Sequence, residues 1–193
     1  MDKSELNEAR TNPDFLNYLE ETRVKSIEEG NISAMYETLD SMLVLDLDED
    51  KINSLYGEIL KVAFDAVEKI VNQDKKLNLQ DDNLLYVRAF YEHAIEKWSF
   101  DNFDGAKELV FVLANIIEDE LLEKSLNVLI VALTNKISVD EFYEACVDFD
   151  ANSTHEHYGY FMVDFRFNTD EYLAQNQELL KEQYSKLQHL LDA

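Results

Sequence analysis

The fold is set by residues 103–135, which read FDGAKELVFVLANIIEDELLEKSLNVLIVALTN. Two apolar runs lie within them, at 109–114 and 126–133, and only Glu118-Asp119-Glu120 separates the helices that carry these runs. A helix that is apolar nearly all round belongs at the centre of a bundle rather than on its flank. Because the turn between the two helices is short, we expect them to form an antiparallel hairpin at the centre of the core.

Helical periodicity continues on both sides of this hairpin. Asn12-Pro13-Asp14 is typical of a helix start, and Gly30 is typical of a helix end. Ser138 and Glu141 have the spacing of a capping box, which predicts another helix start. Apolar residues at three- and four-residue spacing predict the helices around the hairpin. Their apolar stripes run over residues 15–27, 35–43, 52–70, 84–98, 142–149 and 173–190.

The composition agrees with a helical fold. The chain holds only four Gly and one Pro, and these are the residues that the turns of an all-β protein require. We therefore predict a single all-α domain over residues 1–193, as an antiparallel helical bundle or a short helical-hairpin array of about seven to eight helices. The polar stretch 72–82 is the predicted joint between two subdomains.

One segment departs from the helical pattern. Residues 158–167 alternate between two sides, which predicts a strand or an extended arm. One side carries Phe161, Val163, Phe165 and Phe167, and the other carries Tyr160, Met162, Asp164 and Arg166. Such an arm can add to a partner or exchange between two copies of the chain, so a homo-oligomer stays open.

The charge of the chain is strongly negative. Against 41 Asp and Glu stand 17 Lys and Arg, which gives a formal net charge of −24 on a chain that is 46% hydrophobic. The apolar content is sufficient for a packed core, so the acids must cover the surface. Solubility of a small domain needs a net charge of magnitude only about 2–8. We therefore expect a basic protein partner and expect neither nucleic acid nor a membrane to be bound.

Processing and membrane signals are not evident in the sequence. Cys146 is the single cysteine, so an internal disulfide is excluded. The first residues carry no apolar run behind a basic patch, and no apolar run approaches the roughly 20 residues that span a bilayer. A cytoplasmic location is the resulting expectation.

Residues 103–109, Phe-Asp-Gly-Ala-Lys-Glu-Leu, resemble the second helix of a tetratricopeptide repeat, with Ala106 at the small packing position. Ala94 and Trp98 in the preceding helix fall near the small and aromatic positions of that family. The resemblance covers about residues 84–147 and implies a helical-repeat scaffold that binds other proteins. No 34-residue period recurs along the chain, so a plain helical bundle is the alternative.

Motifs for catalysis or cofactor binding are weak. The chain has neither a phosphate-binding glycine loop nor a Gly-x-Ser-x-Gly turn, so we expect a protein that is not an enzyme and needs no cofactor. Asp46-x-Asp48-x-Asp50 and Asp148-x-Asp150-x-Asn152 resemble the start of a calcium loop. Both lack the Gly at position six and the Glu at position twelve, so helix-capping turns are expected. His155-Glu156-His157, together with Cys146, leaves open a transition-metal site in the loop 148–157.

Three functions remain. The first is a non-catalytic acidic protein-binding module, an adaptor or chaperone-like factor that engages a basic protein. Its partner-binding residues are expected in and around the extended segment: Tyr158, Tyr160, Phe161, Asp164, Phe165, Asp148, Asp150 and Glu156. The alternative is an acidic inhibitor, either an immunity protein or a nucleic-acid mimic that blocks a nuclease or a nucleic-acid-binding protein. The second alternative is a metal-binding protein that uses the loop 148–157. A nucleic-acid mimic needs its acids in a stripe, whereas an adaptor needs an apolar groove with acids at its rim.

Overall fold

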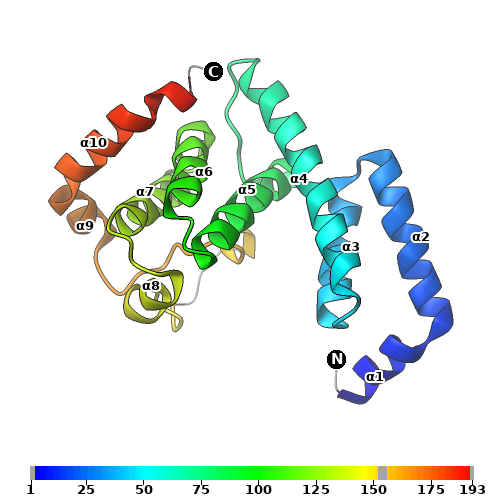
Figure 1. Cartoon of the computed structure of the whole chain (residues 1–193). Helices are drawn as coiled ribbons and strands as arrows, with labels where there is room; N and C mark the ends of the chain where they lie inside the picture. Colours follow the sequence, from blue (N-terminus) through cyan, green and yellow to red (C-terminus); the bar gives the residue numbers. More distant parts are fainter. Residues whose placement is uncertain (1–2, 152–155, 192–193) are drawn as a thin grey trace. The chain divides into compact units, whose positions relative to one another are not determined.

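The computed structural model describes residues 3–151 and 156–191, and the all-α fold is confirmed (Figure 1). The described residues form ten α-helices and no strand. The α-helices are α1 (Lys3–Thr11), α2 (Pro13–Glu29), α3 (Ile32–Val44), α4 (Glu49–Val71), α5 (Asp81–Ser99), α6 (Phe103–Ile116), α7 (Glu120–Thr134), α8 (Val139–Cys146), α9 (Thr169–Gln175) and α10 (Gln177–Leu187). Two 3₁₀ turns lie at Glu156–Tyr158 and Gln188–Leu190.

Two helices exceed the predicted number. The chain before Asn12 forms α1, and Arg10 fixes this helix by donating from Nε to the Leu45 carbonyl oxygen at 2.6 Å. The single final helix that was expected is divided into α9 and α10 at Asn176. The side-chain amide of Asn176 donates to the Tyr172 carbonyl oxygen at 2.9 Å. The Asn176 N–H is shared between the Tyr172 and Leu173 carbonyl oxygens, both at 3.2 Å, which marks the irregular turn where α9 ends.

The chain divides into two compact units, residues 1–66 and 67–193, and the boundary lies inside α4. The polar stretch 72–82, where the sequence predicts a joint, belongs to the second unit. Leu77 within it is fully buried; its N–H donates to the Ile116 carbonyl oxygen and its carbonyl oxygen accepts from the Glu118 N–H, both at 2.8 Å. This stretch is therefore fastened to the turn between α6 and α7.

The first unit contains α1 to α3 and the larger part of α4. The predicted boundaries of α2 are confirmed, because the Asn12 side chain accepts from the Asp14 and Phe15 amides at 3.0 and 3.2 Å. Gly30 ends the helix with φ 62°, a left-handed conformation that glycine adopts without a Cβ clash. The buried apolar residues of this unit include Met35, Leu39, Met42, Leu55, Ile59 and Ala63.

In the second unit α5 packs against α6 and α6 against α7, while α9 and α10 lie against α7 (Figure 1). The expectation for the two central helices is confirmed. Residues 128–133 of α7 are all buried, at no more than 1% exposure. Trp98 of α5 is also buried and donates from Nε1 to the Ile137 carbonyl oxygen at 2.9 Å. The capping box of Ser138 and Glu141 is present at the start of α8.

The extended segment that the sequence predicts over 158–167 forms no strand in the described chain: residues 159–160 form a turn, 161 and 166–167 are bends, and 162–164 have no regular structure. Phe165 makes an isolated antiparallel bridge with Val147, and Asp148 donates its N–H to the Asp164 carbonyl oxygen at 3.0 Å. The predicted alternation between two sides does not hold, because Phe161, Met162 and Val163 are all buried. These three residues pack in the core of the second unit, so the segment is not a free arm.

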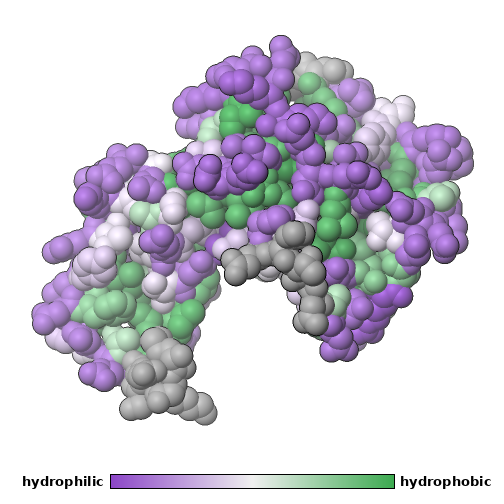
Figure 2. Space-filling view, turned by 180° about the vertical axis from the view of Figure 1, so that it is seen from behind, coloured by the Kyte–Doolittle hydropathy of each residue, from purple (hydrophilic) through white to green (hydrophobic). Residues whose placement is uncertain are grey.

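The surface view from behind shows hydrophilic residues over much of the exterior, with hydrophobic atoms visible between them (Figure 2). This pattern agrees with the expected placement of the acids outside the core. None of the helices in the described residues has the length and hydrophobicity needed to cross a membrane.

Candidate functional site

A pocket of ≈ 340 Å³ lies in the second unit, between α5, the C-terminal end of α8 and residues 159–164. Aromatic residues form much of its wall: Tyr91, Tyr143, Phe149, Tyr160 and Phe161. Acidic residues line it as well: Glu92, Asp148 and Asp164. No lysine or arginine occurs among the described residues that line the pocket. The pocket therefore combines aromatic surface with negative charge.

Tyr91 of α5 fixes one wall. Its hydroxyl oxygen accepts a hydrogen bond from the Met162 N–H at 3.0 Å, and the Phe161 ring meets the Tyr91 ring edge to face with 5.1 Å between centroids. Burial raises the pKa of Tyr91 well above its usual value, so the hydroxyl stays neutral. These two contacts hold the extended segment against α5 and set the shape of the pocket.

Arg88 supports the rim of the pocket from α5. Its guanidinium lies 4.3 Å from the centroid of the Tyr160 ring, and its Nε donates to Glu92 Oε1 at 2.7 Å. Arg88 itself is buried, at 7% exposure, whereas Tyr160 is 42% exposed. A cation over an aromatic face and beside a carboxylate is thus already present next to the pocket.

The other wall presents two exposed aromatic rings. Tyr143 and Phe149 lie 5.0 Å apart between ring centroids and are 43% and 57% exposed. Asp148 lies just before Phe149 and is held by two hydrogen bonds: its N–H donates to the Asp164 carbonyl oxygen, and its Oδ1 accepts from the Asp150 N–H at 3.1 Å. Exposed aromatic side chains are enriched at contact sites for other molecules.

Four of the eight predicted partner-binding residues line this pocket: Asp148, Tyr160, Phe161 and Asp164. Asp150 is exposed beside it, at the turn that follows α8. Tyr158 is buried and donates from its hydroxyl to Asp119 Oδ2 at 2.8 Å. Burial, together with this carboxylate, raises the pKa of Tyr158 to about 12. Tyr158 therefore fastens the extended segment to the start of α7.

The two remaining predicted residues do not line the pocket. Phe165 packs against Phe142 and Phe167, at centroid distances of 6.0 and 5.3 Å. The side chain of Glu156 lies outside the described residues. The chemically notable lining residues that sequence reasoning missed are Tyr91 and Glu92 of α5, Tyr143 of α8, and Phe149. The apolar stripe expected over 142–149 is too long, because α8 ends at Cys146 and Phe149 lies exposed in the turn that follows. The sequence offers no signal for them: Tyr91 has the spacing of a core residue, Glu92 is one acid among many, and the exposure of Tyr143 and Phe149 is visible only in the structure.

The acidic loops behave as turns in the described residues. Asp48 Oδ1 accepts from the Lys51 N–H at 3.0 Å at the start of α4, which is a capping contact. Across the part of the chain that the structure covers, no group of three or more His, Cys, Asp and Glu residues is arranged to hold a metal ion. His155 lies outside that part, so the metal site in the loop 148–157 stays a prediction. Burial raises the pKa of the Cys146 thiol, which keeps it protonated near neutral pH.

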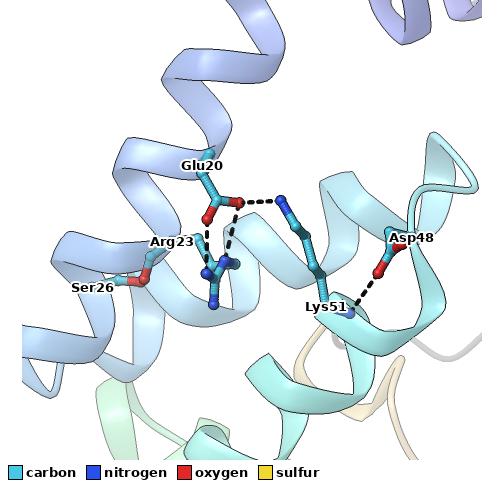
Figure 3. A network of polar contacts seen from close by, with 5 residues as sticks. All are labelled: Glu20, Arg23, Ser26, Asp48 and Lys51. Carbon is cyan, nitrogen blue, oxygen red and sulfur yellow. Dashed lines mark hydrogen bonds and ion pairs between the residues drawn. The ribbon is translucent and has the colours of Figure 1, made fainter.

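A second pocket, of ≈ 300 Å³, lies in the first unit. Its lining includes the charged residues Glu20, Arg23, Asp48 and Lys51, whose polar contacts are drawn in Figure 3. Glu20 accepts from Arg23 Nη2 at 2.8 Å and from Lys51 Nζ at 3.0 Å. The hydrogen bond from Arg23, and then that from Lys51, lowers the pKa of Glu20 to about 2. Asp48 also lines this pocket, so two carboxylates stand against two cations. The cluster therefore joins α2 to the start of α4 and offers little net charge to a ligand.

Comparison of the chain with protein-family models, with curated proteins and with solved structures gives no match.

Proposed function

We propose that this protein is a non-catalytic acidic protein-binding module, an adaptor or chaperone-like factor, that engages a basic protein partner through the pocket of the second unit. The observation that carries the proposal is the make-up of that pocket. Five aromatic residues and three carboxylates line it, and no lysine or arginine occurs among its described lining residues.

Elementary electrostatics favours a cationic occupant. The face of an aromatic ring is negative and attracts an ammonium or guanidinium group within about 6 Å of its centroid. The carboxylates of Asp148 and Asp164 add direct attraction, whereas Glu92 is already paired with Arg88 at 2.7 Å. The net charge of −24 extends the attraction beyond the pocket and steers a basic partner toward the surface. The same field repels nucleic acid and anionic lipid.

The surrounding helices support a binding role over an inhibitory one. The packing of α5 on α6 and of α6 on α7 supports a helical-hairpin scaffold, and the resemblance to tetratricopeptide repeats implies that such a scaffold binds proteins. An acid-rimmed aromatic pocket is also the feature that separates an adaptor from a nucleic-acid mimic, which needs a stripe of acids instead. Exposed aromatic residues in such a pocket are typical of the few contacts that dominate a binding energy.

The test is fluorescence anisotropy with a labelled basic peptide of about ten residues, containing both Lys and Arg, at low and physiological salt. The informative variants are Phe149→Leu and Asp164→Asn. Their matched controls are Phe100→Leu, at a residue 78% exposed, and Asp101→Asn, at an exposed residue whose positive φ of 57° asparagine also tolerates. Phe100 and Asp101 lie in the second unit and do not line the pocket.

We expect each pocket variant to weaken binding about fivefold and each control to leave it within about twofold. Equal affinities for the pocket variants and their controls would mean that the peptide senses only the diffuse charge of the surface. That result would refute the proposal, as would the failure of the basic peptide to bind at either salt concentration.

A further inference from the structure

We infer that the pocket receives an arginine side chain of the partner and selects it over lysine. The inference deepens the proposed function and rests on it. In the proposed contact, the guanidinium stacks on an exposed aromatic ring of the pocket and donates hydrogen bonds to the carboxylates of Asp148 and Asp164.

The chain itself contains an example of the proposed contact. The Arg88 guanidinium covers the Tyr160 ring at 4.3 Å and donates to Glu92 at 2.7 Å, with Arg88 only 7% exposed. The Tyr160 ring and the Glu92 carboxylate thus help to hold the Arg88 guanidinium, which has little contact with water. Tyr160 and Glu92 are also pocket residues, so this arrangement forms part of the wall that an incoming side chain meets.

The opposite wall also combines aromatic rings with carboxylates, and no lysine or arginine among the described lining residues covers them. The rings of Tyr143 and Phe149 are exposed and adjacent, with 5.0 Å between centroids. Asp148 and Asp164 are tied together by the hydrogen bond between their backbones at 3.0 Å. Two carboxylate-bearing residues fixed side by side can accept from the several N–H groups of one guanidinium.

The shape and hydration of the cation decide between arginine and lysine. A guanidinium is planar, weakly hydrated and stacks on aromatic faces, whereas an ammonium is compact and strongly hydrated. Stacking of an arginine on the half-exposed rings of Tyr143 and Phe149 should therefore be more favourable in free energy than contact of a lysine with them. The pocket, at ≈ 340 Å³, lies at the small end of the range for ligand sites, which suits one side chain rather than a folded segment.

The experiment compares two peptides of equal length and charge, one with arginine and one with lysine at every basic position. Binding of each peptide to the full chain and to four variants is measured by isothermal titration calorimetry. The variants are Phe149→Leu, which keeps an apolar side chain but removes the aromatic face, Asp164→Asn, and the controls Phe100→Leu and Asp101→Asn. Circular dichroism confirms that each variant is folded.

We expect the arginine peptide to bind about tenfold more tightly than the lysine peptide. This preference should fall to about twofold or less in Phe149→Leu and persist in Phe100→Leu. Asp164→Asn should weaken binding of the arginine peptide about fivefold, and Asp101→Asn should not.

The failures of the two proposals are distinguishable. If both peptides bind equally and both depend on Asp164 and Phe149, the selection of arginine is wrong while the binding function stands. A preference for arginine that survives in Phe149→Leu also overturns the inference, because stacking is then not its cause. If neither peptide binds, or if the pocket variants behave as their controls, the proposed function fails as well.

Discussion

The hydroxyl of Tyr91 provides a sharp test of how the pocket is built. Replacing Tyr91 by Phe keeps the ring and removes only the oxygen that accepts from the Met162 N–H at 3.0 Å. Tyr91 and Met162 are 4% and 8% exposed, so water cannot readily replace the lost acceptor. A buried donor left without a partner costs about 1–3 kcal/mol. We therefore expect the variant to lose about 2 kcal/mol of the free energy of unfolding of the second unit.

Urea denaturation followed by tryptophan fluorescence measures this loss in the correct unit. Trp98 is the only tryptophan in the chain, belongs to the second unit and is 1% exposed, so its emission reports the unfolding of that unit. With a urea dependence of about 2 kcal/mol/M, the expected loss lowers the unfolding midpoint by about 1 M. The matched control is Tyr143→Phe, which removes a hydroxyl from a ring that is 43% exposed.

The reasoning is refuted if Tyr91→Phe shifts the midpoint no further than Tyr143→Phe does. That result would mean that the Met162 N–H is satisfied in another way and that the Tyr91 hydroxyl does not hold the extended segment. A large loss in both variants would equally contradict it, because an exposed hydroxyl should contribute less than about 0.5 kcal/mol.

Two further predictions concern the first unit. In the folded chain the pKa of Glu20 is lowered from 4.5 to about 2 by its contacts with Arg23 and Lys51. These ion pairs therefore stabilise the fold fully above about pH 4.5, and their contribution is lost as the pH falls toward 2. Because this carboxylate is 40% exposed, solvent screening limits the effect. Between pH 4.5 and 2 the free energy of unfolding of the wild type should fall by about 1 kcal/mol more than that of Glu20→Gln, as measured by urea unfolding followed by circular dichroism. An equal fall in both proteins would contradict the prediction. Gly30→Ala should cost about 1 kcal/mol in the same measurement, because φ is 62° although nothing lies within 4 Å of the added Cβ. Its control, Gly57→Ala in the interior of α4, should instead stabilise by about 0.5–1 kcal/mol, and a loss in both variants would show that backbone conformation is not the cause.

Much of the fold was predictable because its signals are local. The cap at Asn12, the left-handed Gly30 and the capping box at Ser138 each depend on a few neighbouring residues and their hydrogen bonds. The central position of α6 and α7 depends only on their apolar content, which the sequence displays directly. The division at Asn176 was less visible, because asparagine can also point its side chain to solvent within a helix.

The pocket was only partly predictable, because its walls come from distant parts of the chain. The aromatic residues of the extended segment stand out by their spacing. By contrast, the hydrogen bond between Tyr91 and Met162 joins residues 71 positions apart. In the sequence Tyr91 has the spacing of an ordinary core residue. The loss of alternation at Phe161 to Val163 has the same origin: the segment is enclosed on both sides by elements that sequence periodicity cannot place.

The chain itself supplies little positive charge near the acidic wall of the pocket. Between residues 138 and 172, which contain most of the acidic wall, Arg166 is the only lysine or arginine. Its guanidinium donates from Nη1 to the Glu144 carbonyl oxygen at 2.8 Å, so it already has a backbone partner. Arg88, which approaches from α5, is likewise engaged with Tyr160 and Glu92. Under the proposed function, the partner supplies the further positive charge that faces Asp148 and Asp164. The net charge of −24 is the long-range part of the same proposal, because such a field favours the approach of a basic partner.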